Sequence, residues 1–493
     1  MNAQKQKNLW MFPLGTVGRD MIYTLFINFI LTYILFTRQL TAAQLSAITA
    51  VMVAARVFDA LNDPVMGNII ERTRTHWGKF KPWLVIGILS TSVVVYLAFN
   101  TNLQGWAFVC FFGVIYLLYS ITYTMHDISY WGMVAALGSD ADERNRFTSR
   151  ASLFAGIGGT LASVLIPMFT TGGMTIGGSA SIAFGRIALV VCILSPLFLC
   201  FTIFGVKEKQ AKATQEVPAI SFKKIVSTIT GNDQLMWIAV IFLIQQVGNG
   251  IVVGGLGSTY IYFDFGYNGG LYSIFTIVGM SATAFLMMGY PAISRRIRRK
   301  KLMGIMAVIS TVGYALMLVP GLLLPGGNMV KYWLIVIGYM LSNFGQYCYY
   351  LIMMISIINT VEYNEYKHGI RDEAIIASLR PFLTKLASAL IVIITSASYL
   401  IFGVTSYTNQ ISDLESMAAS GAMAEEAKLA AISEVISGVG HGQANGLLLC
   451  MTVIPCVLML ISYFLYKKHY LLDEDEYERI CKELEARNQA DEA

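Results

Sequence analysis

Residues 58–70 read FDALNDPVMGNII, which places two aspartates, Asp59 and Asp63, at positions i and i+4 of an apolar stretch. This stretch belongs to a longer apolar run, residues 44–71, that could cross a membrane as a helix, since about 20 such residues span the hydrocarbon core. A charged side chain near the middle of a spanning helix costs about 2.5–3.5 kcal/mol, so it usually marks an ion or substrate path. The two aspartates therefore predict a site inside the membrane.

The composition of the whole chain agrees with a membrane location for this stretch. Of the 493 residues, 56% are hydrophobic and 13% are charged, whereas about 25% are charged in soluble domains. Because the backbone must satisfy its own hydrogen bonds in lipid, we expect an all-α membrane protein. The sequence predicts twelve transmembrane helices, at 9–36, 44–71, 82–100, 105–137, 149–170, 183–205, 234–263, 268–292, 302–324, 331–361, 374–404 and 443–467.

The basic residues of the loops predict the orientation of the chain. They follow the second, fourth, sixth and eighth spans, and the alternate loops carry almost none. By the positive-inside rule, both termini lie in the cytoplasm of a multi-pass protein of the cell membrane. The net charge of +5 lies in these loops, so we interpret it as topology and expect no nucleic-acid partner.

A polar segment near the middle divides the chain into two halves of six spans, which is typical of transporters built from repeats. We expect an N-terminal six-helix bundle over 1–206 and a central cytoplasmic loop over 207–232. A C-terminal six-helix bundle would cover 233–467, and a cytoplasmic tail 468–493. The polar insertion at 405–440 has helical spacing, and we interpret it as a surface helix or as a lid over the outer mouth.

The charged residues within the spans predict a cation site. Asp59 and Asp63 leave the same helix face, and Arg56 lies one turn before Asp59. In the fourth span, Thr124 and Asp127 have a similar spacing. Two neighbouring carboxylates repel each other unless a cation lies between them, and hard oxygen ligands suit Na⁺, Li⁺ or a proton. In the alternative, Asp59 pairs with Arg56 and only holds helices together.

The surroundings of Asp127 predict a sugar site. In the stretch YTMHDISYW, Tyr123 and Trp131 lie one turn before and after Asp127 on the same helix face. Aromatic rings can pack against the C–H face of a sugar, while carboxylates accept hydrogen bonds from its hydroxyls. Other charged residues that could line the same cavity are Asp20, Arg150 and Lys385.

These stretches resemble a known family, the glycoside-pentoside-hexuronide:cation symporters of the major facilitator superfamily, typified by the melibiose permease. The resemblance rests on ARVFDALNDPVMGNIIERTRTHWGKFKPWLVIG at 55–87, with support from GTVGRD at 15–20, RASLFAG at 150–156 and VEYNEYKHGIRDEA at 361–374. It implies a major facilitator fold of two six-helix bundles and symport of a sugar or glycoside by alternating access. The coupling cation would be Na⁺, Li⁺ or H⁺, and no cofactor is implied.

The resemblance also implies roles for individual residues. The cation would be bound by Asp59, Asn62, Asp63, Thr124 and Asp127, with Asp59, Asp63 and Asp127 as metal ligands if the ion is Na⁺. The sugar would be bound by Asp20, Tyr123, Asp127, Trp131, Arg150 and Lys385. Because Asp127 belongs to both sets, it offers a physical route for coupling the two ligands.

Several positions depart from the family pattern. Arg19 stands where the melibiose permease has lysine, Tyr350 where it has tryptophan and Pro381 where it has threonine, and Arg380 adds a charge beside the expected sugar site. We count Arg19, Tyr350 and Arg380 among the candidate substrate-binding residues. The second cation in the eleventh span would suit an acidic sugar, or Arg380 would pair with a carboxylate or a carbonyl for structural reasons.

Charged loops suggest a gate on the cytoplasmic side. The loop after the second span is chiefly basic, whereas the loop between the tenth and eleventh spans carries the acidic residues Glu362, Glu365, Asp372 and Glu373. Ion pairs between the two would close the inner mouth, although in the alternative the basic residues serve only topology. The basic gate candidates are Arg72, Arg74, Lys79 and Lys81.

The leading hypothesis is therefore a monomeric, cation-coupled sugar symporter whose partners are a small sugar, a monovalent cation and the lipid bilayer. The alternatives are a transporter of an amphipathic, lipid-like substrate and a sensor that binds sugar without moving it. The sequence contains no nucleophile elbow, no paired His/Cys spacing and no Gly-rich phosphate loop. We therefore do not expect an enzyme.

Overall fold

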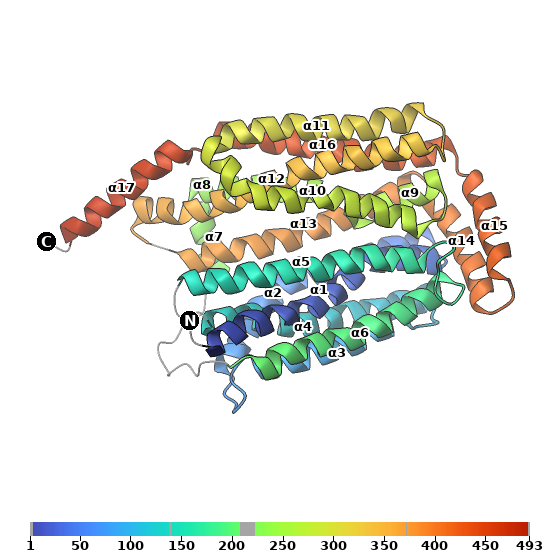
Figure 1. Ribbon diagram of the computed structural model, residues 1–493, viewed down its shortest axis with the longest axis horizontal. Helices are drawn as coiled ribbons and strands as arrows, with labels where there is room; N and C mark the ends of the chain where they lie inside the picture. Colours follow the sequence, from blue (N-terminus) through green and yellow to red (C-terminus); the bar gives the residue numbers. More distant parts are fainter. Residues whose placement is uncertain (1–2, 138–140, 208–221, 371, 492–493) are drawn as a thin grey trace. The chain divides into compact units, whose positions relative to one another are not determined.

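The computed structural model describes residues 3–137, 141–207, 222–370 and 372–491, and within these ranges all regular elements are helices (Figure 1). Among the described residues, twelve helical segments are long and apolar enough to cross a membrane. This confirms the number of spans that the sequence predicts.

The chain folds into two compact units. Unit 1 contains Met1–Pro218, Ser258–Ile274 and Ser396–Gln443, and unit 2 contains Ala219–Gly257, Phe275–Thr395 and Ala444–Ala493. The predicted domain boundaries follow the order of the sequence, whereas unit 1 also takes in two segments from the second half of the chain. Much of the predicted central loop, at 208–221, lies outside the described residues.

Unit 1 is built on six long helices from the first half of the chain. They are α1 (Ala3–Thr37), α2 (Ala42–Arg72), α3 (Lys81–Phe99), α4 (Gly105–Leu137), α5 (Ala141–Thr170) and α6 (Ala180–Gly205). Unit 1 also holds α9 (Gly257–Phe265), α14 (Val404–Ala419) and α15 (Glu425–Ser437).

Unit 2 contains the remaining helices. They are α7 (Phe222–Gly231), α8 (Asp233–Gly250), α11 (Arg299–Leu323), α12 (Met329–His368), α16 (His441–His469) and α17 (Glu474–Asp491). The division between the units passes through α10 (Gly269–Arg296) and α13 (Glu373–Ile401). The core of unit 2 is a cluster of buried side chains that includes Ile238, Phe242, Met303, Tyr349 and Ile352.

Close packing at glycines fixes α1 beside α5 and α6. A Cβ at Gly18 would lie 2.5 Å from the Cα of Ser195, and one at Gly158 would collide with the Val17 carbonyl oxygen. The Ser195 hydroxyl donates a hydrogen bond of 2.7 Å to the Gly18 carbonyl. Small residues allow such close approach between spanning helices. The α1 segment that carries the site residues is therefore held on two sides.

The seventh predicted span, 234–263, is not one regular helix. It is divided into α8 and α9 by the π-helical segment η1 (Val252–Leu256), inside which Gly255 has φ of 124°. Only glycine adopts such a backbone conformation without strain. The glycine-rich sequence Gly248–Gly257 therefore breaks the helix. The sequence-based prediction of one continuous span over 234–263 missed this break.

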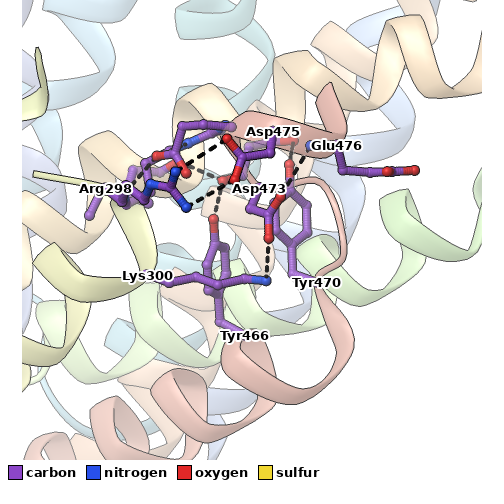
Figure 2. Close-up of polar contacts among 11 residues, drawn as sticks. Arg298, Lys300, Tyr466, Tyr470, Asp473, Asp475 and Glu476 are labelled. Atoms are coloured by element: carbon purple, nitrogen blue, oxygen red, sulfur yellow. Dashed lines mark hydrogen bonds and ion pairs between the residues drawn. The ribbon is translucent and has the colours of Figure 1, made fainter. Parts of the chain in front are cut away.

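The C-terminal tail forms the helix α17, and acidic residues at its start bind a basic turn of the same unit. Figure 2 shows these contacts. The Arg298 guanidinium lies 2.9 Å from Asp475, Arg299 lies 3.1 Å from Glu474, and the Lys300 ammonium lies 3.1 Å from Asp473. We call these three ion pairs the tail clasp.

Two carboxyl groups of the tail clasp, those of Asp473 and Glu474, have lowered pKa values. Partial burial alone would raise the pKa of Asp473, but the hydrogen bond from Lys300 holds it below its ordinary value of 3.8. Burial likewise opposes ionisation of Glu474, whereas backbone N–H donors and the Arg299 charge hold its pKa below 4.5. The tail is anchored further by the Tyr470 hydroxyl, which donates to the Ser356 carbonyl at 2.8 Å.

Candidate functional site

One face of α4 approaches the two aspartates of α2. Ser120, Thr124 and Asp127 share this face because they are spaced by four and three residues along the helix. The Ser120 hydroxyl donates to the Asp59 carboxylate, and the Thr124 hydroxyl donates to Asp63 at 3.4 Å. Each aspartate of α2 thus meets a different hydroxyl of α4.

The alternative pairing considered for Asp59 is present as well. The Arg56 guanidinium lies 3.7 Å from the Asp59 carboxylate, and both side chains are buried. The buried side-chain nitrogen of Asn62, in the same helix, has no hydrogen-bond partner. Within the part of the chain that the structure describes, no three His, Cys, Asp or Glu side chains are close enough to hold a metal ion together. The assignment of metal ligands therefore stays a prediction.

Arg19 connects α1 with α4. Its guanidinium donates to the Asp20 carboxylate from two nitrogens, at 2.8 and 3.0 Å, and to Asp127 from a third nitrogen at 3.1 Å. The side chain of Arg19 is 4% exposed, and those of Asp20 and Asp127 are 20% and 37% exposed. The Arg19 guanidinium therefore forms ion pairs with two of the predicted sugar ligands, Asp20 and Asp127, at the same time.

Aromatic side chains surround this ion cluster. The Arg19 guanidinium lies 5.0 Å from the ring centre of Tyr130 and 5.1 Å from that of Trp131, within the range of cation–π attraction. Tyr123 stacks on Tyr119 with ring centres 5.4 Å apart. The cluster can therefore offer a hydrogen-bonding carboxylate next to flat apolar surfaces, which is the chemistry that binds a sugar.

Sequence reasoning did not identify four residues of this cluster as site residues. They are Tyr119, Ser120, Tyr130 and Tyr23, whose ring centre lies 5.4 Å from that of Tyr123. Helical spacing could have indicated Ser120, which lies one turn before Thr124, and Tyr23, which lies one turn after Arg19. Tyr119 lies one turn before Tyr123 and Tyr130 lies one turn after Asp127, so the same spacing could have indicated them too.

Arg150 of α5 binds the start of α1 in this structure. Its guanidinium donates to the Leu9 carbonyl at 3.3 Å and lies 4.7 Å from the ring centre of Trp10. These contacts are about three turns before Asp20 on α1, since a turn contains 3.6 residues. The contacts of Arg150 with Leu9 and Trp10 therefore lie apart from the pair formed by Arg19 and Asp20, and its role in sugar binding stays a prediction.

Three candidate substrate residues belong to unit 2. Arg380 of α13 donates a hydrogen bond of 2.6 Å to the Tyr350 hydroxyl of α12, and its guanidinium lies 5.7 Å from the centre of that ring. The structural pairing expected for Arg380 was with a carboxylate or a carbonyl, and the observed partner is a hydroxyl. Lys385 lies further along α13 and is half-buried.

The basic gate candidates make contacts inside unit 1. The Lys79 ammonium lies 2.8 Å from Glu71 in the last turn of α2. Lys81 donates to the carbonyls of Ile203 and Val206 at 2.7 and 2.8 Å. Arg74 donates to nearby backbone carbonyls, and Arg72 is exposed. The acidic candidates, Glu362 and Glu365, lie on α12 of unit 2. The gate stays a prediction.

Comparison with known proteins decides the family of this chain. Residues 11–474 match the family described as MFS/sugar transport protein. The chain belongs to this family. The resemblance to the cation symporters of the major facilitator superfamily is thereby confirmed.

Curated relatives of this family member include two sugar carriers. It is 30% identical over 405 residues to the lactose permease of Leuconostoc lactis, an alignment that covers 77% of this chain and 60% of the relative. It is 26% identical to the raffinose carrier protein of Pediococcus pentosaceus, with 96% and 70% covered. The chain thus spans only about 60% of the length of lactose permeases that it matches.

A solved structure shows the same fold. The inward-facing, unoccupied bacterial homologue of the human lysosomal transporter Spinster matches with a TM-score of 0.62 and 13% identity, over 96% of this chain and 98% of that chain. At this identity the similarity concerns the fold alone. It confirms the predicted major facilitator fold.

Proposed function

We propose that this chain is a symporter of the cell membrane that couples the entry of a sugar or glycoside to that of Na⁺, Li⁺ or H⁺ by alternating access. Membership of the MFS/sugar transport protein family and the names of the curated relatives support this proposal. The main observation in support of the proposal is the position of α4. One face of this helix contacts the aspartates of α2 and, through Asp127, the arginine of α1. Both termini would lie in the cytoplasm.

The chemistry of the α2–α4 contact fits a small hard cation. Two carboxylates and two hydroxyls supply oxygen ligands, and a hydroxyl that now donates to a carboxylate can turn its lone pairs toward an ion. A cation between Asp59 and Asp63 would relieve their repulsion. The proposed cation residues remain Asp59, Asn62, Asp63, Thr124 and Asp127.

Coupling would pass through α4. A cation that draws Thr124 toward Asp63 also fixes the helix turn that carries Asp127, and Asp127 faces Arg19 and the proposed sugar site. An ion that orders this turn lowers the cost of ordering it for the sugar. By thermodynamic linkage, bound sugar must then raise the affinity for the cation by the same factor.

Uptake by proteoliposomes tests this proposal. The purified full chain is reconstituted, and accumulation of radiolabelled lactose, raffinose and isoprimeverose is measured with and without an inward gradient of Na⁺, Li⁺ or H⁺. The names of the relatives motivate these sugars. Gradient-dependent accumulation of a sugar is the expected result, and Asp63→Asn should abolish accumulation while sugar counterflow persists. The matched control is Glu426→Gln, at an exposed acid of α15.

Other outcomes distinguish the alternatives. Sugar binding without any uptake would indicate a sensor, and stimulation by amphipathic lipids without sugar binding would indicate a lipid-like substrate. For the substrate class, the guanidinium of Arg380 next to Tyr350 supports a trial of glucuronides beside neutral galactosides. Stronger competition by a glucuronide than by the matching galactoside would support an acidic sugar.

A further inference from the structure

The insertion between the last two spans folds as two helices that pack within unit 1. The sequence predicted a single surface helix or a lid over 405–440, and the structure instead has α14 and α15, joined by a turn in which Gly421 has φ of 76°. Figure 1 shows both helices at one end of the long helices of unit 1. Ile411, Ser412 and Ile432 are buried in this packing. The insertion is therefore a docked element.

A buried ion pair joins the insertion to the loop before α6. Glu415 of α14 and Lys428 of α15 lie 3.3 Å apart, with side chains 1% and 0% exposed. The Lys428 ammonium also donates to the Gly178 carbonyl at 2.7 Å, and Glu415 accepts from the Ala180 N–H at 2.7 Å. Ala180 is the first residue of α6, where a carboxylate also favours the helix dipole. Both charges therefore bind the insertion and the α5–α6 loop together.

A second contact joins the insertion to the turn between α1 and α2. The Asn409 side chain accepts from the Leu40 N–H and donates to the Leu40 carbonyl, both at 2.9 Å. One helix turn further on, Asp413 accepts a hydrogen bond from the exposed side chain of Gln39. The insertion therefore holds two loops of the first half of the chain.

The covalent attachment of the insertion lies in the other half of the chain. It follows α13 and precedes α16, and most of both helices belongs to unit 2. Only Phe402 and Gly403 separate α13 from α14, and residues 438–440 separate α15 from α16. Two extended residues reach about 7 Å at most. A larger displacement of α13 and α16 must therefore pull the insertion away from α1 and α6.

We propose that α14 and α15 form an outer latch, which binds the α1–α2 turn and the α5–α6 loop in one state of the cycle and must release them in the other. This inference rests on the proposed function, because alternating access in this fold moves the two halves against each other at each mouth. The latch is closed in this structure. The Glu415–Lys428 pair and the Asn409 contact hold it closed, and release exposes the buried face of α14.

A disulfide across the latch tests whether it must open. The Gln39→Cys/Asp413→Cys double variant of the full chain is oxidised, and the new disulfide is identified by mass spectrometry against the native cysteines. Sugar uptake into proteoliposomes should then fall below about a tenth of the reduced rate, because the cycle cannot pass a locked state. Reductant should restore it. Each single variant, oxidised in the same way, is the matched control and should keep its rate.

The result that would overturn the latch is a fully cross-linked double variant that transports as fast as its reduced form. If the disulfide does not form, a short bis-maleimide cross-linker replaces it, because Gln39 and Asp413 meet through longer side chains than two cysteines have. Failure of that cross-link as well would overturn the latch. If the wild-type protein carries none of the three sugars, the proposed function fails, and the latch itself is tested by labelling.

Labelling of Ser412→Cys with a membrane-impermeant maleimide measures latch opening without any sugar. Adding Glu415→Gln or Lys428→Met should speed labelling about tenfold or more, because removal of one partner leaves the other charge uncompensated. The double change, Glu415→Gln with Lys428→Met, should label more slowly than Lys428→Met alone. Glu426→Gln, in the exposed part of α15, is the control. Equal labelling rates in all variants would overturn the latch.

Discussion

Removal of the Arg19 charge should weaken sugar binding as well as the fold. The Arg19→Gln variant replaces the guanidinium with a shorter, neutral amide and leaves Asp20 and Asp127 without the cation that binds both. The two carboxylates would then repel each other or take up a proton. Either change removes the arrangement in which their oxygens can accept hydrogen bonds from sugar hydroxyls.

The structure sets the expected size of this effect. Removal of one partner from a buried ion pair costs about 3–5 kcal/mol. We take the lower end, about 3 kcal/mol, because the Asp127 side chain is 37% exposed and water can stabilise its charge. Since 1.4 kcal/mol is a factor of ten, affinity should fall about 100-fold. Arg19→Lys keeps the charge but cannot reproduce the forked contacts, so about a tenfold loss is expected.

Isothermal titration calorimetry on the detergent-solubilised protein measures this prediction, with the sugar that the wild-type protein accumulates. A thermal melt of each variant reports whether the fold is intact. If Arg19→Gln binds sugar within threefold of wild type while its melting temperature falls, the arginine only stabilises the helix packing. The reasoning about the sugar site would then be refuted.

Three further predictions concern the cation site, the kink and the tail. Ser120→Ala should change the cation concentration for half-maximal uptake about fivefold or more, since Asp59 loses a buried hydrogen-bond partner at a cost of about 1–3 kcal/mol. An unchanged concentration would exclude a role for Ser120 at the cation site. Gly255→Ala should lower the free energy of unfolding by about 1–3 kcal/mol because Gly255 has a positive φ. The control is Gly67→Ala, whose added Cβ meets no atom within 4 Å and should not lower it. Equal melting curves for the two variants would contradict the role of Gly255 in the helix break. Because the pKa values of Asp473 and Glu474 are lowered, their two ion pairs are complete above the ordinary values of 3.8 and 4.5, weaken as pH falls below these values and are lost as pH falls through the lowered pKa values. A spin label on the tail helix should therefore gain mobility only below these ordinary values, and mobility that already rises at about pH 5 would contradict this prediction.

The spanning helices could be predicted from the sequence because each apolar window is long and is bounded by polar loops. The same windows did not reveal the break at η1, since a hydropathy average treats Gly255 as one more apolar residue. What decides the break is a backbone angle that only glycine adopts without strain. The glycine-rich sequence was visible, but its conformation depends on the packing around it.

Sequence spacing predicted which site residues share a face of one helix. It did not predict which residues of different helices contact each other. Helical spacing placed Thr124 and Asp127 on one face of α4, and the structure confirms that Thr124 reaches α2. The link from Arg19 to Asp127 joins residues 108 positions apart, so no local pattern indicates it. For the same reason, the acidic start of the tail helix and its basic partners were visible as charges but not as pairs.

The most direct test of the account is sugar accumulation by proteoliposomes of the full chain under an imposed cation gradient, with Asp59→Asn and Asp63→Asn measured beside wild type. Symport through the α2–α4 site predicts that wild type concentrates the sugar only while the gradient lasts, and that each variant loses accumulation but keeps sugar counterflow. Accumulation that persists at the wild-type level in both variants would contradict the account.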